Sequence, residues 1–429
     1  MTVTSVEPYR EVDFDKDGDG PGGQAEALAS LARRGCTDLV LFTHGWNNSR
    51  SVASGLFDRF FAPFPGVTGG GRRLGYAGLV WPSMMFSDER TPDYAALAAV
   101  APGRTATVSR IAELLAEEPA DEEAFAEFAG LLRELTGIAP AGQADPAGLV
   151  AAEVPAFLAA DPLTVYAMFA DAREAEAEAA GTGAEAGAHA ATEGMAGAAA
   201  GPGVGGPGAE SLFGGDRVKR LWKGAKEALR QATYFTMKRR AGVVGERGLG
   251  PLLGDLGRRA PGLRVHLVGH SFGARLVAHA LRGLPADVRT VKSVTLLQGA
   301  FSHYAFADRL PHDRGRRGSL GGLQSRVDGP VVACHSRHDT ALRVFYPLAS
   351  RLARDDESLL GDDRRWWAIG YDGVQAVPGT TVRTLGAALR DGVPAAGCVS
   401  VDAAQVVSEH SDICHADLAR LVARAGRLA

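Results

Sequence analysis

This 429-residue sequence contains few cysteines and has a small net charge. It contains four cysteines, and no two of them form a Cys-x-x-Cys pair. A disulfide scaffold is therefore excluded, and a reducing compartment suits the chain. The sequence has 46 basic and 50 acidic residues, for a net charge of −4. It thus lacks the basic face typical of a general nucleic-acid binder, and no nucleic-acid partner is predicted.

Long hydrophobic runs are also missing. No window of about 18 uncharged apolar residues occurs, so no membrane-spanning segment is predicted. The N-terminus lacks a basic stretch followed by an apolar one, which argues against a signal peptide. We therefore expect a cytoplasmic protein. Hydrophobic residues make up 46% of the chain, enough for a large core.

Phosphate and calcium loops are incomplete. There is no G-x-x-x-x-G-K-[ST] motif, and the glycines in residues 248–254 are spaced one residue too widely for G-x-G-x-x-G. Residues 13–24 resemble the start of an EF-hand loop, but Gln24 stands where a bidentate Glu is needed. We interpret that segment as a solvated turn and predict no cofactor.

Residues 334–339 include Cys, His and Asp side chains of the kinds that bind metal ions, and Cys414 and His415 could join them. Zinc needs three or four such groups that converge on one point. Cys334 and His335 are adjacent on a predicted strand, so their side chains point to opposite faces. The pattern therefore favours no metal.

Short apolar runs alternate with amphipathic segments in two parts of the chain. Strands are predicted at 38–43, 76–81, 263–268, 291–297, 329–335, 398–401 and 404–407, and helices at 25–33, 49–61, 216–260, 273–281, 340–353 and 415–425. The helical region at 216–260 is expected to break near the glycines at 242–250. This alternation implies crossover connections. It predicts an α/β fold with a mostly parallel central sheet and helices on both faces.

The stretch between these two parts has a different residue pattern. Helical spacing recurs at 121–135 and after Asp161, with no strand between, and residues 174–215 are rich in Ala, Gly and Glu. We predict a flexible segment at 1–24, an α/β domain from 25–83 and 216–429, a helical insertion at 84–173 that could cap the site, and a low-complexity linker at 174–215.

The strongest chemical motif is Gly269-His270-Ser271-Phe272-Gly273, which matches G-x-S-x-G. The apolar run LRVHLV precedes it and the helical pattern ARLVAHAL follows it. A strand–turn–helix setting of this kind is what a nucleophile elbow requires. The turn would expose the Ser271 hydroxyl at the carboxyl edge of the sheet, beside a helix N-terminus that favours negative charge.

A serine needs a base to take its proton and an acid to orient that base. Asp339 follows the predicted strand at 329–335 and is our candidate acid; the alternative is that it only caps the next helix. Asp308 and Asp313 are alternatives, followed by Asp372 and Asp402. The candidate base is His410, directly after the last strand, with His415 as the alternative.

Acyl transfer also needs N–H donors for an oxyanion. The N–H of Phe272, just after the nucleophile, is one candidate. The second is the N–H of Trp46, in the loop His44-Gly45-Trp46 after the strand 38–43, with Gly45 as the alternative. Asn47 and Asn48 are expected to hold this loop through side-chain hydrogen bonds.

Strand–HGWNN, strand–WPS, strand–GHSFG–helix, strand–SRHD and a late EHSD together resemble the α/β-hydrolase superfamily, and most of all its bacterial esterase- and lipase-like members. The resemblance covers about residues 25–83 and 216–429. It implies Ser271 as nucleophile, Asp339 as acid, His410 as base, and Trp46 and Phe272 as oxyanion donors. The large insertion and the lack of an evident full set of eight strands depart from the family pattern.

These observations predict a serine hydrolase that cleaves an ester-type bond in a small or lipid-like acyl substrate. A thioesterase or acyltransferase would use the same residues. A binding or scaffold protein on a hydrolase fold is the alternative of a different class, because fold does not determine function.

Overall fold

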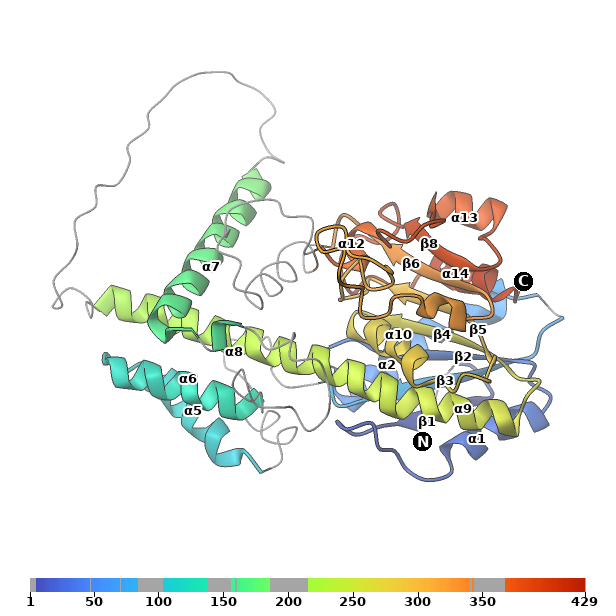
Figure 1. The fold of residues 1–429 in the computed structure, drawn as a ribbon, viewed down its shortest axis with the longest axis horizontal. Helices are drawn as coiled ribbons and strands as arrows, with labels where there is room; N and C mark the ends of the chain where they lie inside the picture. The colour runs from blue at the N-terminus through green and yellow to red at the C-terminus, as the bar shows by residue number, and fades with distance from the viewer. Residues whose placement is uncertain are drawn as a thin grey trace, which may run out of the picture. The chain divides into compact units, whose positions relative to one another are not determined.

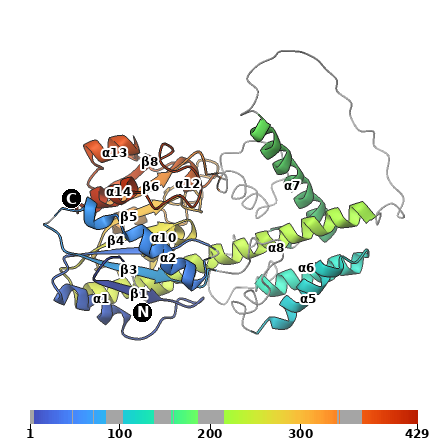
Figure 2. The ribbon, with the colours of Figure 1, turned by 180° about the vertical axis from the view of Figure 1, so that it is seen from behind.

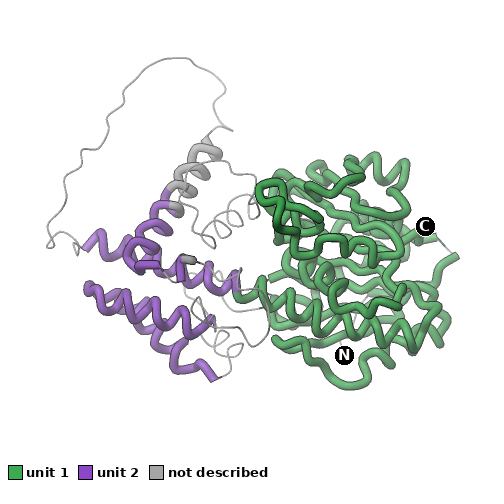
Figure 3. The backbone as a smooth tube through the Cα atoms, viewed as in Figure 1, with its two compact units in different colours: residues 1–87, 236–351, 356–429 green, residues 88–235, 352–355 purple. Residues whose placement is uncertain are grey.

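The computed structural model describes residues 5–46, 48–69, 71–83, 103–136, 156–158, 160–185, 215–339, 342 and 367–428. The chain divides into two compact units (Figure 3). Unit 1 comprises 1–87, 236–351 and 356–429, and unit 2 comprises 88–235 and 352–355.

Unit 1 is built on one eight-stranded sheet with the order β1-β3-β2-β4-β5-β6-β8-β7, and every neighbouring pair is parallel. The strands are β1 (Tyr9–Asp13), β2 (Asp38–Thr43), β3 (Leu74–Val80), β4 (Arg264–His270), β5 (Val291–Leu297), β6 (Pro330–His335), β7 (Thr381–Thr384) and β8 (Gly397–Asp402). The predicted α/β class with a parallel central sheet is confirmed.

Helices flank both faces of this sheet (Figures 1 and 2). In unit 1 they are α1 (Gln24–Arg33), α2 (Arg50–Phe61), α3 (Phe64–Val67), α9 (Gly250–Arg259), α10 (Phe272–Gly283), α12 (Ile369–Asp372), α13 (Leu385–Asp391) and α14 (Ala416–Gly426). Short 3-10 helices occur at Leu323–Arg326 in unit 1 and at Ala156–Leu158 in unit 2. The core on the α2 and α14 side includes a stacked pair, Phe42 and Phe60, with ring centroids 3.9 Å apart.

Three strand assignments differ from the sequence-based ones. The sequence predicts flexibility at 1–24, whereas residues 9–13 form the edge strand β1, which buries only Tyr9 and Val12. β7 lies at the other edge and alternates between half-exposed and exposed residues. The strand predicted at 404–407 is wrong. There the N–H groups of Val406 and Val407 bond to the carbonyl of Ala403 and close a turn instead.

The helical region before β4 does not break at its glycines. α8 (Gly215–Val243) continues through a π-helix (Val244–Leu249) into α9. The glycines bring this region against α10, because a Cβ at Gly245 would lie 2.2 Å from the carbonyl oxygen of Leu276. The glycines of this region therefore allow helices to pack closely and do not end the helix.

Unit 2 contains α5 (Thr105–Glu117), α6 (Glu122–Thr136), α7 (Pro162–Glu185) and the first part of α8. Phe125 of α6 stacks on Trp222 of α8 with ring centroids 4.6 Å apart, and the indole N–H of Trp222 donates to the carbonyl of Pro119. This packing explains why unit 2 extends to residue 235 rather than ending at 215. Helix α7 also reaches Glu185, inside the tract predicted as a linker.

Among the described residues, no helix is both long and apolar enough to cross a membrane. The predicted helix at 340–353 lies outside the described residues except for Leu342.

Candidate active site

Ser271 occupies a strained turn between β4 and α10. Its backbone has φ 56° and ψ −118°, a region that non-glycine residues rarely adopt. The glycines on either side are required, since a Cβ at Gly269 would lie 2.3 Å from the carbonyl oxygen of Gly273, and one at Gly273 would lie 2.5 Å from that of His44. The motif thus has the backbone geometry that a nucleophile elbow needs.

The structure brings Ser271, His410 and Asp339 into one hydrogen-bonded chain. His410 Nε2 lies 2.9 Å from Ser271 Oγ, and His410 Nδ1 lies 2.6 Å from Asp339 Oδ2. The carboxylate can only accept, so Nδ1 carries the proton and Nε2 is left to accept the serine O–H. This arrangement prepares Nε2 to take the proton from Ser271.

Asp339 bonds both to His410 and to the backbone three residues further along the chain. Its side chain is fully buried, with one oxygen on His410 and the other accepting the N–H of Leu342 at 3.0 Å. Its own N–H donates to the carbonyl of Ser336, and the Ser336 hydroxyl donates to the carbonyl of Val407. The loop that carries the acid is therefore tied to the loop that carries the base.

The alternative residues are engaged elsewhere. Other candidate acids bond as follows: Asp308 to Arg317, Asp372 to His303, and Asp313 and Asp402 to the N–H groups of Gly315 and Ala404. His415 Nε2 lies 2.6 Å from Asp412 Oδ1, so this histidine pairs within its own loop.

The loop after β2 lies directly against the serine. A Cβ at Gly45 would lie 3.0 Å from both His270 Nδ1 and Ser271 Cβ, so any larger residue there would crowd both side chains. The side-chain amide of Asn48 donates to the carbonyls of Gly45 and Trp46. Because a trans peptide points its N–H opposite to its C=O, the bond to Gly45 directs the Trp46 N–H away from Asn48.

Further contacts fix the same loop. His44 Nδ1 donates to the carbonyl of Gly45 at 2.9 Å, while Nε2 accepts the N–H of Trp81 at 3.4 Å. Burial lowers the pKa of His44 to about 4, so the ring is neutral near pH 7 and can accept. The Ser83 hydroxyl accepts the N–H of Asn48 and donates to its carbonyl. Asn48 thus holds the loop as predicted, and Asn47 lies outside the described residues.

Phe272, the other predicted oxyanion donor, is the first residue of α10. N–H groups in the first turn of a helix have no acceptor within the helix and favour negative charge nearby. Its ring is buried and lies 6.2 Å from that of Trp46, so the two donor residues are neighbours.

The sequence did not reveal the hydrogen-bond partner of His270. Its Nε2 donates to the backbone carbonyl of His410 at 2.8 Å, across 140 positions of sequence. The only available signal was its place beside the nucleophile, which says nothing about a partner so far along the chain.

No three His, Cys, Asp or Glu side chains in the described ranges are placed to hold a metal ion. Burial raises the pKa of the Cys334 thiol to about 12, which disfavours the thiolate that zinc binds.

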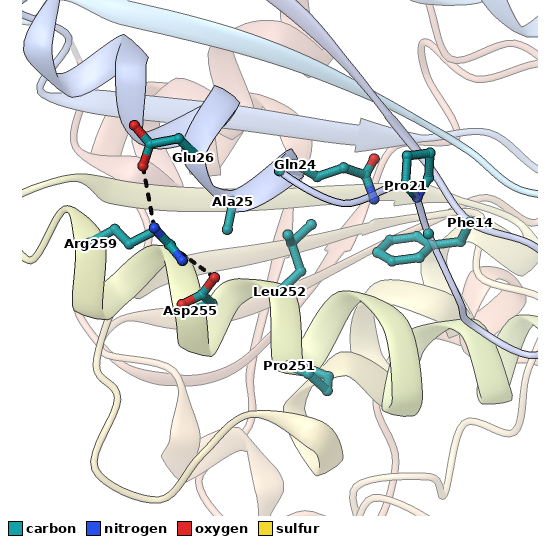
Figure 4. Close-up of a pocket in the computed structure, with 11 residues that line it drawn as sticks. Phe14, Pro21, Gln24, Ala25, Glu26, Pro251, Leu252, Asp255 and Arg259 are labelled. Atoms are coloured by element: carbon teal, nitrogen blue, oxygen red, sulfur yellow. Dashed lines mark hydrogen bonds and ion pairs between the residues drawn. The ribbon is translucent and has the colours of Figure 1, made fainter.

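A cavity of about 290 Å³ lies away from the serine, between the segment 14–26 and α9 (Figure 4). Its apolar lining includes Phe14 and Leu252. Arg259 at its rim pairs with Glu26 and Asp255. Its charged groups are therefore paired with one another, and we assign it no chemistry.

Comparison of the chain with protein-family models, curated proteins and solved structures gave no match.

Proposed function

We propose that this protein is a serine hydrolase of the α/β-hydrolase type, which cleaves an ester-type acyl bond. The observation that carries the proposal is the chain from Asp339 through His410 to Ser271, with the serine held at a strained turn. Strain at a non-glycine residue persists only where the surrounding structure imposes it, and it concentrates at functional sites.

The proposed reaction has two halves. His410 Nε2 takes the proton of Ser271 as Oγ attacks the substrate carbonyl carbon, and the oxyanion that forms accepts N–H bonds from Trp46 and Phe272. The carbonyl re-forms, the leaving group departs with the proton from His410, and an acyl ester remains on Ser271. Water then attacks this ester and gives one proton to His410. As the bond between the acyl carbon and Ser271 Oγ breaks, His410 returns that proton to Oγ, and the carboxylic acid is released.

Asp339 supports both halves without accepting the proton itself. Its buried carboxylate holds His410 in the tautomer that accepts at Nε2 and stabilises the imidazolium formed during transfer. A thioester substrate or an alcohol acceptor would use the same residues. The proposal therefore covers cleavage of a thioester and transfer of the acyl group to an alcohol as alternatives to ester hydrolysis.

The decisive test is labelling of the purified protein with a fluorophosphonate, followed by peptide mapping. We expect the label on Ser271 and none on Ser271→Ala. Ser325→Ala, which removes an exposed hydroxyl bonded only to the nearby carbonyl of Gly322, should label as the wild type does.

If the folded wild-type protein takes no label, the proposal is wrong and a binding or scaffold function takes its place. If it is labelled, turnover of matched ester and thioester substrates, with and without an added alcohol, distinguishes an esterase from a thioesterase or an acyltransferase.

A further inference from the structure

His270 connects three loops of the candidate site. It directly precedes Ser271, its Nε2 donates to the carbonyl of His410, and its Nδ1 faces the backbone of Gly45. The side chain is buried, and its ring centroid lies 4.9 Å from that of His410. One imidazole therefore contacts the loops that carry the nucleophile, the base and a predicted oxyanion donor.

The bond to His410 constrains the backbone of the proposed base. A hydrogen bond to a residue's own carbonyl fixes the orientation of the peptide group that follows it. The direction of the imidazole depends on that backbone. The Asp339 bond holds the His410 ring at Nδ1, and the His270 bond holds its main chain.

We propose that His270 is a positioning residue that acts through the backbone of His410 and keeps Nε2 of that residue aimed at Ser271. This inference rests on the proposed function and extends it to a residue outside the Ser–His–Asp set. The required property is a neutral N–H donor at the position of Nε2.

The surroundings of His270 keep it neutral. Burial and, to a smaller extent, the nearby His410 together lower its pKa to about 3. A neutral ring places no positive charge beside His410, which must itself become positive during the reaction. A charged residue at position 270 would oppose that step.

Two near-isosteric substitutions separate donor position from simple packing. In His270→Gln, the amide Nε2 is three bonds from Cβ, as in histidine, and can reach the carbonyl of His410. In His270→Asn, the amide nitrogen reaches only the place of Nδ1. We expect the Asn variant to react with fluorophosphonate roughly ten- to a hundredfold more slowly and the Gln variant to stay within a few-fold of wild type.

The same contrast should occur in steady-state kinetics with an ester that the wild type turns over. Loss of positioning lowers kcat and leaves KM unchanged, because His270 is not expected to touch the substrate. His270→Phe, which keeps a ring but has no donor, should behave like the Asn variant. Circular dichroism and thermal midpoints establish that each variant is folded.

The outcomes are distinguishable. If wild type labels at Ser271 and the folded Asn, Phe and Gln variants label equally fast, this inference is overturned and the proposed function stands. Equal slowing of folded Gln and Asn variants also overturns it, since the donor position would then not matter. If the folded wild-type protein does not label at all, the proposed function is wrong, and this inference, which rests on it, is wrong as well.

Discussion

In the described part of unit 1, two histidines each bridge a serine and an aspartate by hydrogen bonds. We call these groups the edge set, Ser271, His410 and Asp339, and the internal set, Ser293, His266 and Asp38. The composition is the same and the hydrogen bonds range from 2.6 to 2.9 Å. The difference between them therefore lies in placement.

The internal set lies within the sheet. His266 of β4 bonds to Asp38 of β2 and to Ser293 of β5, and all three side chains are fully buried. Ser293 lies inside strand β5, next to an irregularity in its register with β4. Gly426 of α14 closes over the ring, because a Cβ there would lie 2.7 Å from His266 Nδ1. No substrate could reach this serine without unfolding.

The edge set differs in backbone and access. Ser271 has a positive φ at the start of a helix, and the side chain of His410 is 24% exposed. The carboxylate binds Nδ1 of His410 but Nε2 of His266. We therefore propose that the Ser–His–Asp pattern stabilises the sheet in the internal set and serves catalysis only in the edge set, where the serine is strained and the histidine is partly exposed.

The largest expected effect comes from Asp→Asn at the two acids. Asp339→Asn should lower kcat by about 10³- to 10⁴-fold, because the base loses the partner that selects its tautomer. Asp38→Asn should instead lower the free energy of unfolding by about 3 kcal/mol, since it breaks a buried pairing with His266 and Arg264. Kinetics and urea unfolding of both variants check this. The reverse assignment of effects would contradict the comparison.

Acidification should act on the internal histidine through stability. Burial is the largest influence on His266 and lowers its pKa despite the bond to Asp38. The unfolded chain therefore binds the proton more readily, so stability is fully present above about pH 6.5 and falls as pH decreases, by up to about 1.4 kcal/mol per pH unit per histidine. His44 and His270, with pKa values of about 4 and 3, act in the same direction.

Urea unfolding between pH 7 and 4.5 measures this slope, and a His266→Gln variant should show a smaller one. A wild-type stability that does not change across this range would refute the interpretation.

The smallest effect is expected for Ser293→Ala. Removing one neutral hydrogen bond should cost about 1 kcal/mol of unfolding free energy. Fluorophosphonate labelling of the folded protein should be unchanged, because Ser293 is buried away from the edge set. Slower labelling of this variant, at equal foldedness, would show that the two sets are coupled.

The sequence predicted the middle strands because they are rich in apolar residues, with continuous apolar runs in DLVLFT of β2 and PVVACH of β6. It did not predict β1 or β7, since edge strands such as YREVD and TVRT bury few side chains and show little pattern. The run at 404–407 was misleading because apolar residues in a buried turn resemble those in a strand.

The residues that the structure joins at the edge could be proposed from local motifs, each directly after a predicted strand. The internal set could not, because Asp38, His266 and Ser293 lie in unremarkable strand sequences. Only the register of the sheet brings them together. His266 is paired with Ser293 across β4 and β5, and with Val40 across β2 and β4. Asp38 lies two positions before Val40 on β2, within reach of the His266 ring. Long-range pairing of this kind, like the bond from His270 to His410, leaves no local trace in the sequence.

The loops of the candidate site follow four strands, β2, β4, β6 and β8, and extend from His44 to His410. None of the four can supply its group until the sheet has joined segments far apart along the chain. Such nonlocal topologies assemble slowly. In the proposed function, the reactivity of the Ser271 hydroxyl therefore reports the assembly of these four strands: during refolding it should appear only when the last of them has docked.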